Sequence, residues 1–174
     1  MKKIIFTILI FVVASVIYFQ FDKTNKEKPL STNDYKNISY IIDGKSIKLL
    51  NGKSQEEIPN SSSKITTRYF GNETTGDFDN NGYEDVAFIM SQDGSGSGIF
   101  FYATTALRQA DGSYRGTNAI FLGDRISPQT TEFREGKIII NYADRKEGEP
   151  MATVPSIGVS KYLKIQDGVL VEIK

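Results

Sequence analysis

The sequence predicts an all-β domain, mainly antiparallel, preceded by one N-terminal transmembrane or signal helix. Short stretches rich in Ile, Val, Phe, Tyr and Thr recur after residue 38, and these residue types favour strands. Turn dipeptides such as Asp43-Gly44 and Asn51-Gly52 separate the stretches, as in β-hairpins. Beyond residue 21 no segment has the apolar spacing of an amphipathic helix. We therefore expect a meander, a small barrel or a sandwich.

The N-terminal segment, residues 1–21, is predicted to be a membrane anchor. Lys2 and Lys3 precede an apolar run from Ile4 to Phe21, which as a helix would extend about 27 Å. The hydrocarbon core of a bilayer is about 30 Å thick, so such a helix would span it. The two leading lysines favour a cytoplasmic N-terminus. The rest of the chain would then lie outside the cytoplasm, on the periplasmic or cell-surface side.

A cleaved signal peptide is the alternative for the same segment, because both begin with basic residues and an apolar run. Small residues occur at Ala14 and Ser15, but bulky residues follow at Ile17, Tyr18 and Phe19. No small-x-small cleavage site closes the run. Retention as an anchor is therefore the favoured prediction, and the protein would be secreted if the leader were cleaved.

Residues 22–37 are predicted to form a flexible linker. The segment is polar and charged, and Pro29 interrupts it. A flexible chain of this length would have an end-to-end distance of about 20–25 Å, enough to hold a domain clear of the lipid headgroups. The extracytoplasmic β domain would then comprise residues 38–174.

Strands are predicted wherever β-favouring residues lie between turn signals. The longest connection runs from Asp144 to Gly158 and contains Pro150 and Pro155. Loops of that length are more often functional than short ones. The predicted strands are Ser39–Ile42, Ile47–Leu50, Lys64–Phe70, Val86–Met90, Ile99–Ala106, Thr117–Leu122, Thr130–Arg134, Lys137–Tyr142, Lys161–Gln166 and Val169–Ile173.

The composition excludes several kinds of site. The 174 residues include no Cys, His or Trp, so the chain has no disulfide, no thiolate–zinc site and no catalytic pair that needs imidazole. Lys plus Arg and Asp plus Glu both number 21, which gives no electrostatic preference for nucleic acid. Any bound metal must have oxygen ligands, and these favour calcium or magnesium.

One segment between two predicted strands has the spacing of a calcium-binding loop. Its oxygen side chains Asp77, Asp79, Asn81 and Asp85 occupy loop positions one, three, five and nine, and Tyr83 at position seven offers its backbone carbonyl. Calcium takes six to eight oxygen ligands, which alternate residues of a tight loop supply. Glycine at position six permits the turn. The alternative is an ordinary turn that only joins two strands.

The loop is not an EF-hand, because Phe88 occupies the position of the bidentate glutamate. It resembles the calcium loops of FG-GAP and related integrin-type repeats, whose Asp-x-Asp-x-Asp-Gly-x-x-Asp pattern precedes an apolar strand. The resemblance covers about fifteen residues, and Asn81 replaces the usual third aspartate. A propeller would need further copies, and none occurs.

A broader resemblance covers approximately Tyr40 to Lys164. Three stretches carry it: Arg68 to Glu73, Gly123 to Ile126 and Asn141 to Arg145. They are similar to an uncharacterised exported bacterial domain sometimes found beside lysozyme-inhibitor-like domains. This resemblance implies an envelope location and supplies no activity or catalytic residue.

The predicted function is therefore a membrane-tethered, extracytoplasmic calcium-binding β domain, a non-catalytic binding or envelope module. Its partners would be the membrane, through the N-terminal helix, and an envelope protein or glycan. One alternative is a small cell-envelope hydrolase using carboxylates around Asp124, Asp144 or Glu132, and another is a lysozyme-inhibitor-like protein. The glycine-rich segment Gly94 to Gly98 is interpreted as a hairpin loop rather than an anion site, because no helix start follows it.

Overall fold

The computed structural model describes residues 34–94 and 96–173. These residues form twelve strands and one short 3-10 helix, so the prediction of a mainly antiparallel all-β fold is confirmed. Within the same residues no helix is long and apolar enough to cross a membrane. The predicted anchor, residues 1–21, and most of the predicted linker lie outside them.

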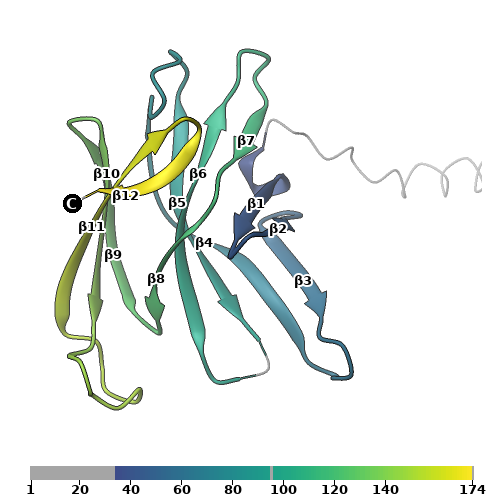
Figure 1. The fold of residues 1–174 in the computed structure, drawn as a ribbon, viewed down its shortest axis with the longest axis vertical. Coiled ribbons are helices and arrows are strands. Elements are labelled where there is room, and N and C mark those ends of the chain that lie inside the picture. The colour runs from purple at the N-terminus through teal and green to yellow at the C-terminus, as the bar shows by residue number, and fades with distance from the viewer. Residues whose placement is uncertain (1–33, 95, 174) are drawn as a thin grey trace, which may run out of the picture. The chain divides into compact units, whose positions relative to one another are not determined.

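The elements follow one another without long excursions, and most consecutive strands pair with each other (Figure 1). In chain order they are η1 (Tyr35–Asn37), β1 (Ser39–Ile42), β2 (Lys45–Lys48), β3 (Lys53–Glu57), β4 (Lys64–Gly76), β5 (Asp85–Asp93), β6 (Ile99–Arg108), β7 (Tyr114–Gly116), β8 (Ile120–Asp124), β9 (Ser127–Arg134), β10 (Lys137–Asp144), β11 (Ile157–Gln166) and β12 (Val169–Ile173).

The strands form three sheets. A six-stranded sheet has the order β3-β4-β5-β6-β7, with β8 also pairing β6, and a four-stranded sheet has the order β12-β11-β10-β9. β1 and β2 form a separate hairpin. All the strand pairs are antiparallel, and of the two isolated bridges the one between Ile41 and Asn118 is parallel and the one between Leu50 and Lys53 is antiparallel.

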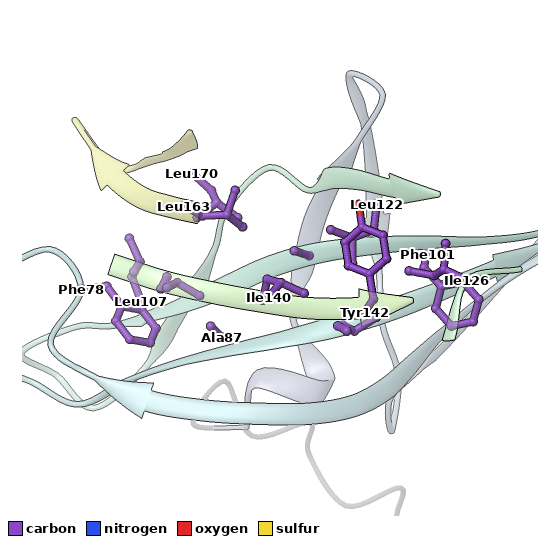
Figure 2. Packing of buried hydrophobic residues seen from close by; sticks show 13 residues of the cluster. Phe78, Ala87, Phe101, Leu107, Leu122, Ile126, Ile140, Tyr142, Leu163 and Leu170 are labelled. Atoms are coloured by element: carbon purple, nitrogen blue, oxygen red, sulfur yellow. The ribbon is translucent and has the colours of Figure 1, made fainter. Parts of the chain in front are cut away.

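The main hydrophobic core lies between the six-stranded and four-stranded sheets (Figure 2). One face of β5 and β6 packs there against the inner face of β10, with contributions from β11 and β12. The buried members of this core are Phe78, Ala87, Ile89, Phe101, Ala103, Leu107, Leu122, Ile126, Ile138, Ile140, Tyr142, Leu163 and Leu170.

A second core lies on the opposite face of the six-stranded sheet, where the β1–β2 hairpin covers it. Tyr40 of β1 packs edge-on against Phe88 of β5, with ring centroids 5.4 Å apart. The central strands β5 and β6 are thus buried on both faces. This burial explains why their sequences are nearly continuous apolar and threonine runs instead of alternating ones.

Two strands were not predicted, β3 and β7. β3 reads Lys-Ser-Gln-Glu-Glu and β7 has only three residues, so neither carries the β-branched or aromatic pattern that marks a half-buried strand. β3 is an edge strand, and charged side chains are common at sheet edges because they discourage pairing with other chains. Its Glu56 forms an ion pair with Lys45, 2.5 Å apart.

Several predicted boundaries also moved. β4 continues to Gly76, beyond the expected end at Phe70, through two irregularities in its pairing with β5. β11 starts at Ile157, so part of the predicted long connection is strand. Pairing with neighbouring strands extended these elements past the residues whose own composition favours strands.

The described chain starts with an anchored turn. Asp34 caps η1 by accepting a hydrogen bond from the Lys36 N–H (2.8 Å), and the Tyr35 ring packs on Phe88 at 5.8 Å. Tyr35 also donates to Glu73 of β4 at 2.7 Å. The last residues of the predicted linker therefore belong to the structured domain.

A side-chain amide joins the two larger sheets. Asn118, which precedes β8, donates from Nδ2 to the Leu170 carbonyl and accepts from the Leu170 N–H through Oδ1, both at 2.9 Å. The amide thus supplies the donor and acceptor that a neighbouring strand would present to β12.

Candidate metal site: the acidic loop

The acidic loop, residues 77–85, connects β4 to β5 across a single antiparallel pair. Gly76 and Asp85 are register partners, so the loop leaves and re-enters the sheet at adjacent positions. Asp77, Asp79 and Asp85 converge in it, and one carboxylate oxygen from each lies within 4.8 Å of the others. The structure therefore brings together the three aspartates that the spacing singled out.

Asp85 is the buried member of this group. Its side chain accepts hydrogen bonds from the Phe78 N–H at 2.8 Å and from the Arg108 N–H at 2.7 Å, and the residue is 0% exposed. Burial raises its pKa above the ordinary aspartate value, and the charges of Asp79 and Asp77 add to the rise. The two backbone hydrogen bonds act against this rise, and the net shift remains upward.

The other two aspartates hold the turn itself. Asp77 accepts from the Asn81 N–H at 3.0 Å and from the Gly82 N–H at 2.9 Å, and Asp79 accepts from the Asn81 N–H at 3.2 Å. Gly82 has φ +87, which favours glycine over other residues. Backbone N–H groups thus point toward the carboxylates and organise the loop around them.

Asn81 and Tyr83 have different positions from the aspartates. The Asn81 side chain donates from Nδ2 to the Arg108 carbonyl (2.9 Å) and to Asp79 (3.3 Å), while its Oδ1 accepts from the Tyr83 N–H (2.8 Å). Tyr83 is 41% exposed. Asn81 therefore contributes donors, not an acceptor, to the carboxylate group in this structure.

Aromatic packing attaches the loop to the four-stranded sheet. Phe78 is 6% exposed and packs edge-on against Phe133 of β9, with ring centroids 4.8 Å apart. A Cβ at Gly76 would lie 2.3 Å from the Phe133 ring, so only glycine permits this approach. Figure 2 shows Phe78 at one end of the main core. Movement of the loop would therefore disturb the packing between the sheets.

The charge of the loop has no side-chain counterion in the described chain. None of the ion pairs among residues 34–94 and 96–173 includes Asp77, Asp79 or Asp85. Three carboxylates this close repel one another when ionised. A divalent cation between them would relieve the repulsion, and the carboxylate oxygens would supply part of its coordination.

No family model, curated protein sequence or solved structure matches this chain. The candidate site therefore rests on the residues and their geometry alone.

The carboxylates of the hydrolase alternative lie outside the acidic loop, and one of them, Asp124, is paired with a cation. Asp124 forms an ion pair with Arg125 at 3.0 Å, and it accepts from the Ile99 N–H at 2.9 Å. Partial burial raises its pKa, but these hydrogen bonds and the charges of Arg125 and Arg145 outweigh burial, so the pKa lies below the ordinary value. A general acid for glycoside hydrolysis requires the opposite shift.

The other two carboxylates of the hydrolase alternative, Glu132 and Asp144, accept hydrogen bonds from uncharged donors. Glu132 is an exposed residue of β9, where it accepts hydrogen bonds from Thr130 and Asn141. Asp144 accepts from the Arg145 N–H at 2.7 Å.

The glycine-rich segment borders a pocket of about 350 Å³. Its side-chain walls include Ile58, Ile65 and Phe100, and the backbones of Gly94 and Gly98 complete it. The segment closes the hairpin of β5 and β6, whose last register partners are Asp93 and Ile99. This observation agrees with the interpretation of the segment as a hairpin loop.

Two supporting residues were missed at the sequence level, Arg108 and Phe133. Arg108 contributes only its backbone N–H and carbonyl to Asp85 and Asn81. Because any residue type can supply these groups, the sequence does not reveal them. Phe133 alternates with polar neighbours in β9, a pattern that marks it as inward-facing. That its partner in the other sheet is Phe78 could not be predicted without knowing how the strands pair.

Proposed function

We propose that the acidic loop binds one calcium ion and that the protein is a non-catalytic, membrane-tethered, extracytoplasmic binding or envelope module. The observation that carries the metal proposal is the convergence of Asp77, Asp79 and Asp85 within 4.8 Å without a basic side chain paired to them in the described chain. The proposed remaining ligands are the Asn81 side-chain oxygen and the Tyr83 carbonyl.

Calcium suits this donor set better than other cations. All the side-chain donors are oxygen atoms, which hard cations prefer. Magnesium demands a near-ideal octahedron and retains its water, whereas calcium accepts six to eight ligands in an irregular loop. Asn81 would have to turn its Oδ1 from the Tyr83 N–H toward the ion.

The ion would act on stability. A ligand that binds only the folded state stabilises it by mass action, about 2.7 kcal/mol at a concentration one hundred times the dissociation constant. Because Phe78 links the loop to Phe133, this stabilisation would extend to the packing between the two larger sheets. The module would then be most rigid where calcium is abundant, as it is outside cells.

The location is supported by the apolar run from Ile4 to Phe21 behind two lysines. A non-catalytic role is supported by the absence of His and Cys from the whole sequence and by the lowered pKa of Asp124. Fractionation of cells that express the full chain, with protease added from outside, tests this part. Recovery in the soluble cytoplasmic fraction, protected from protease, would refute it.

Thermal unfolding with calcium, magnesium or chelator tests the metal proposal. We expect calcium to raise the melting temperature by several degrees and magnesium to do so less. Asp79→Ala should abolish the response, whereas Glu84→Ala should keep it, because Glu84 is an exposed acid of the same loop outside the carboxylate group. Identical wild-type curves with calcium and with chelator would exclude the site.

A further inference from the structure

The Asn81-Gly82 peptide is placed for a reaction that the calcium proposal does not use. An asparagine followed by glycine can lose its side-chain amide when the next backbone nitrogen attacks the side-chain carbonyl carbon. Glycine allows this approach most readily because it has no Cβ. At Gly82 no atom lies within 4 Å of where a Cβ would be, and Asn81 is exposed. The peptide is thus open to water and uncrowded.

The attacking nitrogen already faces a proton acceptor. The Gly82 N–H donates to the Asp77 carboxylate at 2.9 Å. That N–H must lose its proton as the nitrogen forms a bond to carbon, and a carboxylate within hydrogen-bond distance can accept it. Asp77 is thereby a positioned base for this step.

The atom that gains negative charge faces a donor. Asn81 Oδ1 accepts from the Tyr83 N–H at 2.8 Å, and this oxygen carries the charge of the tetrahedral intermediate. A fixed donor at such an oxygen lowers the barrier, as backbone N–H groups do in oxyanion holes. The contacts of Nδ2 with the Arg108 carbonyl and Asp79 hold the amide in this orientation.

From these contacts we propose that Asn81 is a site of self-catalysed deamidation within the folded loop. The Gly82 nitrogen forms a bond to Asn81 Cγ and gives its proton to Asp77. The Cγ–Nδ2 bond then breaks, and Nδ2 leaves as ammonia with that proton. Water opens the resulting five-membered imide at either carbonyl, which yields aspartate or isoaspartate at position 81. No oxidant or cofactor is needed.

A second Asn-Gly peptide supplies an internal control. Asn51-Gly52 lies in the turn between β2 and β3, and the Gly52 N–H donates to the Lys36 carbonyl at 2.8 Å. A neutral carbonyl is a much weaker base than a carboxylate. A Cβ at Gly52 would also lie 3.2 Å from the Tyr69 Cβ, so this peptide is more crowded. It should react more slowly in the folded protein.

The products would change the acidic loop, and this consequence rests on the proposed function. Aspartate at position 81 would add a fourth carboxylate to the three already within 4.8 Å and strengthen calcium binding. Isoaspartate would lengthen the backbone by one carbon and displace the Gly82 and Tyr83 N–H groups. Ageing would therefore divide the protein into tighter-binding and weaker-binding populations.

Peptide mapping by mass spectrometry tests the inference on the full chain, in chelator so that the metal plays no part. The purified protein is incubated at physiological temperature, both folded and unfolded in urea, and the conversion of amide to acid is followed at Asn81 and Asn51. In the folded protein we expect Asn81 to react at least about tenfold faster than Asn51, and in urea the two rates should converge. Asp77→Asn should slow the reaction at Asn81 and leave Asn51 unchanged.

Two results would overturn the inference: an Asn81 rate equal to or below that of Asn51 in the folded chain, or an Asn81 rate that rises on unfolding. The comparison of folded with unfolded wild type needs no variant, so it holds even if Asp77→Asn misfolds. Calcium melts of freshly prepared protein and of Asn81→Asp then test the binding consequence separately. A protein that deamidates as expected but ignores calcium would retain this inference and lose the proposed function.

Discussion

Two acidic turns of the domain hold negative charge in opposite ways. One is the acidic loop, residues 77–85, and the other is the turn around Asp124, and both are called corners below. In the acidic loop three carboxylates converge within 4.8 Å, and burial raises the pKa of Asp85. At the other corner Asp124 is paired with Arg125 at 3.0 Å, and its pKa is lowered despite partial burial. The difference is the source of positive charge: Asp124 is paired with a basic side chain, whereas no ion pair of the described residues includes an aspartate of the acidic loop.

The two corners also differ in how they join the core. Phe78 of the acidic loop is 6% exposed and packs against Phe133. The connection from β10 to β11, near Asp124, instead exposes Val154 by 78%, and its Thr153 carbonyl accepts a hydrogen bond from Arg145. The acidic loop is thus fixed by packing as well as by hydrogen bonds, whereas residues 145–156 of the β10–β11 connection bury no side chain and are held by hydrogen bonds.

The largest expected effect is on packing at the acidic loop. Phe78→Ala should lower the free energy of unfolding by about 3–5 kcal/mol, the usual cost of deleting a buried aromatic ring. Val154→Ala, in the other connection, should change it by less than about 0.5 kcal/mol. Urea unfolding with chelator present measures both. Similar losses for the two variants would contradict the difference in packing.

The next effect concerns Arg145. Its guanidinium donates to the carbonyls of Thr153 (2.6 Å), Arg125 (3.0 Å) and Asp124 (3.3 Å). Arg145→Ala should cost about 1–3 kcal/mol, because it removes charge-assisted hydrogen bonds from partly buried acceptors. Arg145→Lys should recover only part, since an ammonium group cannot reproduce the planar fork.

Hydrogen exchange can localise the loss caused by Arg145→Ala. Amides of residues 146–156 should exchange faster in the variant, while those of β5 remain protected. Faster exchange throughout the domain would show that Arg145 supports the whole fold rather than this connection.

Replacement of aspartate by asparagine should change the free energy of unfolding in opposite directions at the two corners. With chelator present, Asp79→Asn should stabilise the protein by up to about 0.5 kcal/mol, because it removes repulsion with Asp77 and Asp85. Asp124→Asn should destabilise it by about 1 kcal/mol, because it weakens charge-assisted hydrogen bonds. Saturating calcium should reverse the sign at Asp79 and leave that at Asp124. If both variants were stabilised, or both destabilised, in chelator, the proposed difference between the corners would be refuted.

The closeness of the three loop aspartates could be predicted from the sequence, whereas the surroundings of Asp124 could not, for a physical reason. The spacing of Asp77, Asp79 and Asp85 is local, and a short loop brings neighbouring residues together whatever surrounds it. Asp124 and Arg145 are twenty-one positions apart, and their proximity depends on the register of β8, β9 and β10. Register follows from tertiary packing, which one sequence does not display.

The same distinction applies to the fold. Hairpins with strong turn dipeptides, such as Asp43-Gly44 between β1 and β2, were predicted close to their positions. β3 was missed because it is a strand through its pairing with β4, against its own polar composition. The two hydrogen bonds between the Asn118 side-chain amide and Leu170 were also missed, since a single amide in place of a neighbouring strand produces no recognisable sequence pattern.

The smallest expected effect is the pH dependence of stability, which should also differ in sign between the corners. The folded pKa of Asp124 is lowered, so its contribution is present above its unfolded pKa, about 4, and is lost as the pH falls through the folded value. The folded pKa of Asp85 is raised, so its ionisation destabilises the ion-free protein as the pH rises through that value. Acidification should therefore lower the stability of wild type relative to Asp124→Asn and raise it relative to Asp85→Asn, each by less than about 0.5 kcal/mol. Urea unfolding in chelator at a series of pH values measures these differences. If the stability of wild type changed in the same direction relative to both variants, the two corners would hold their charge in the same way.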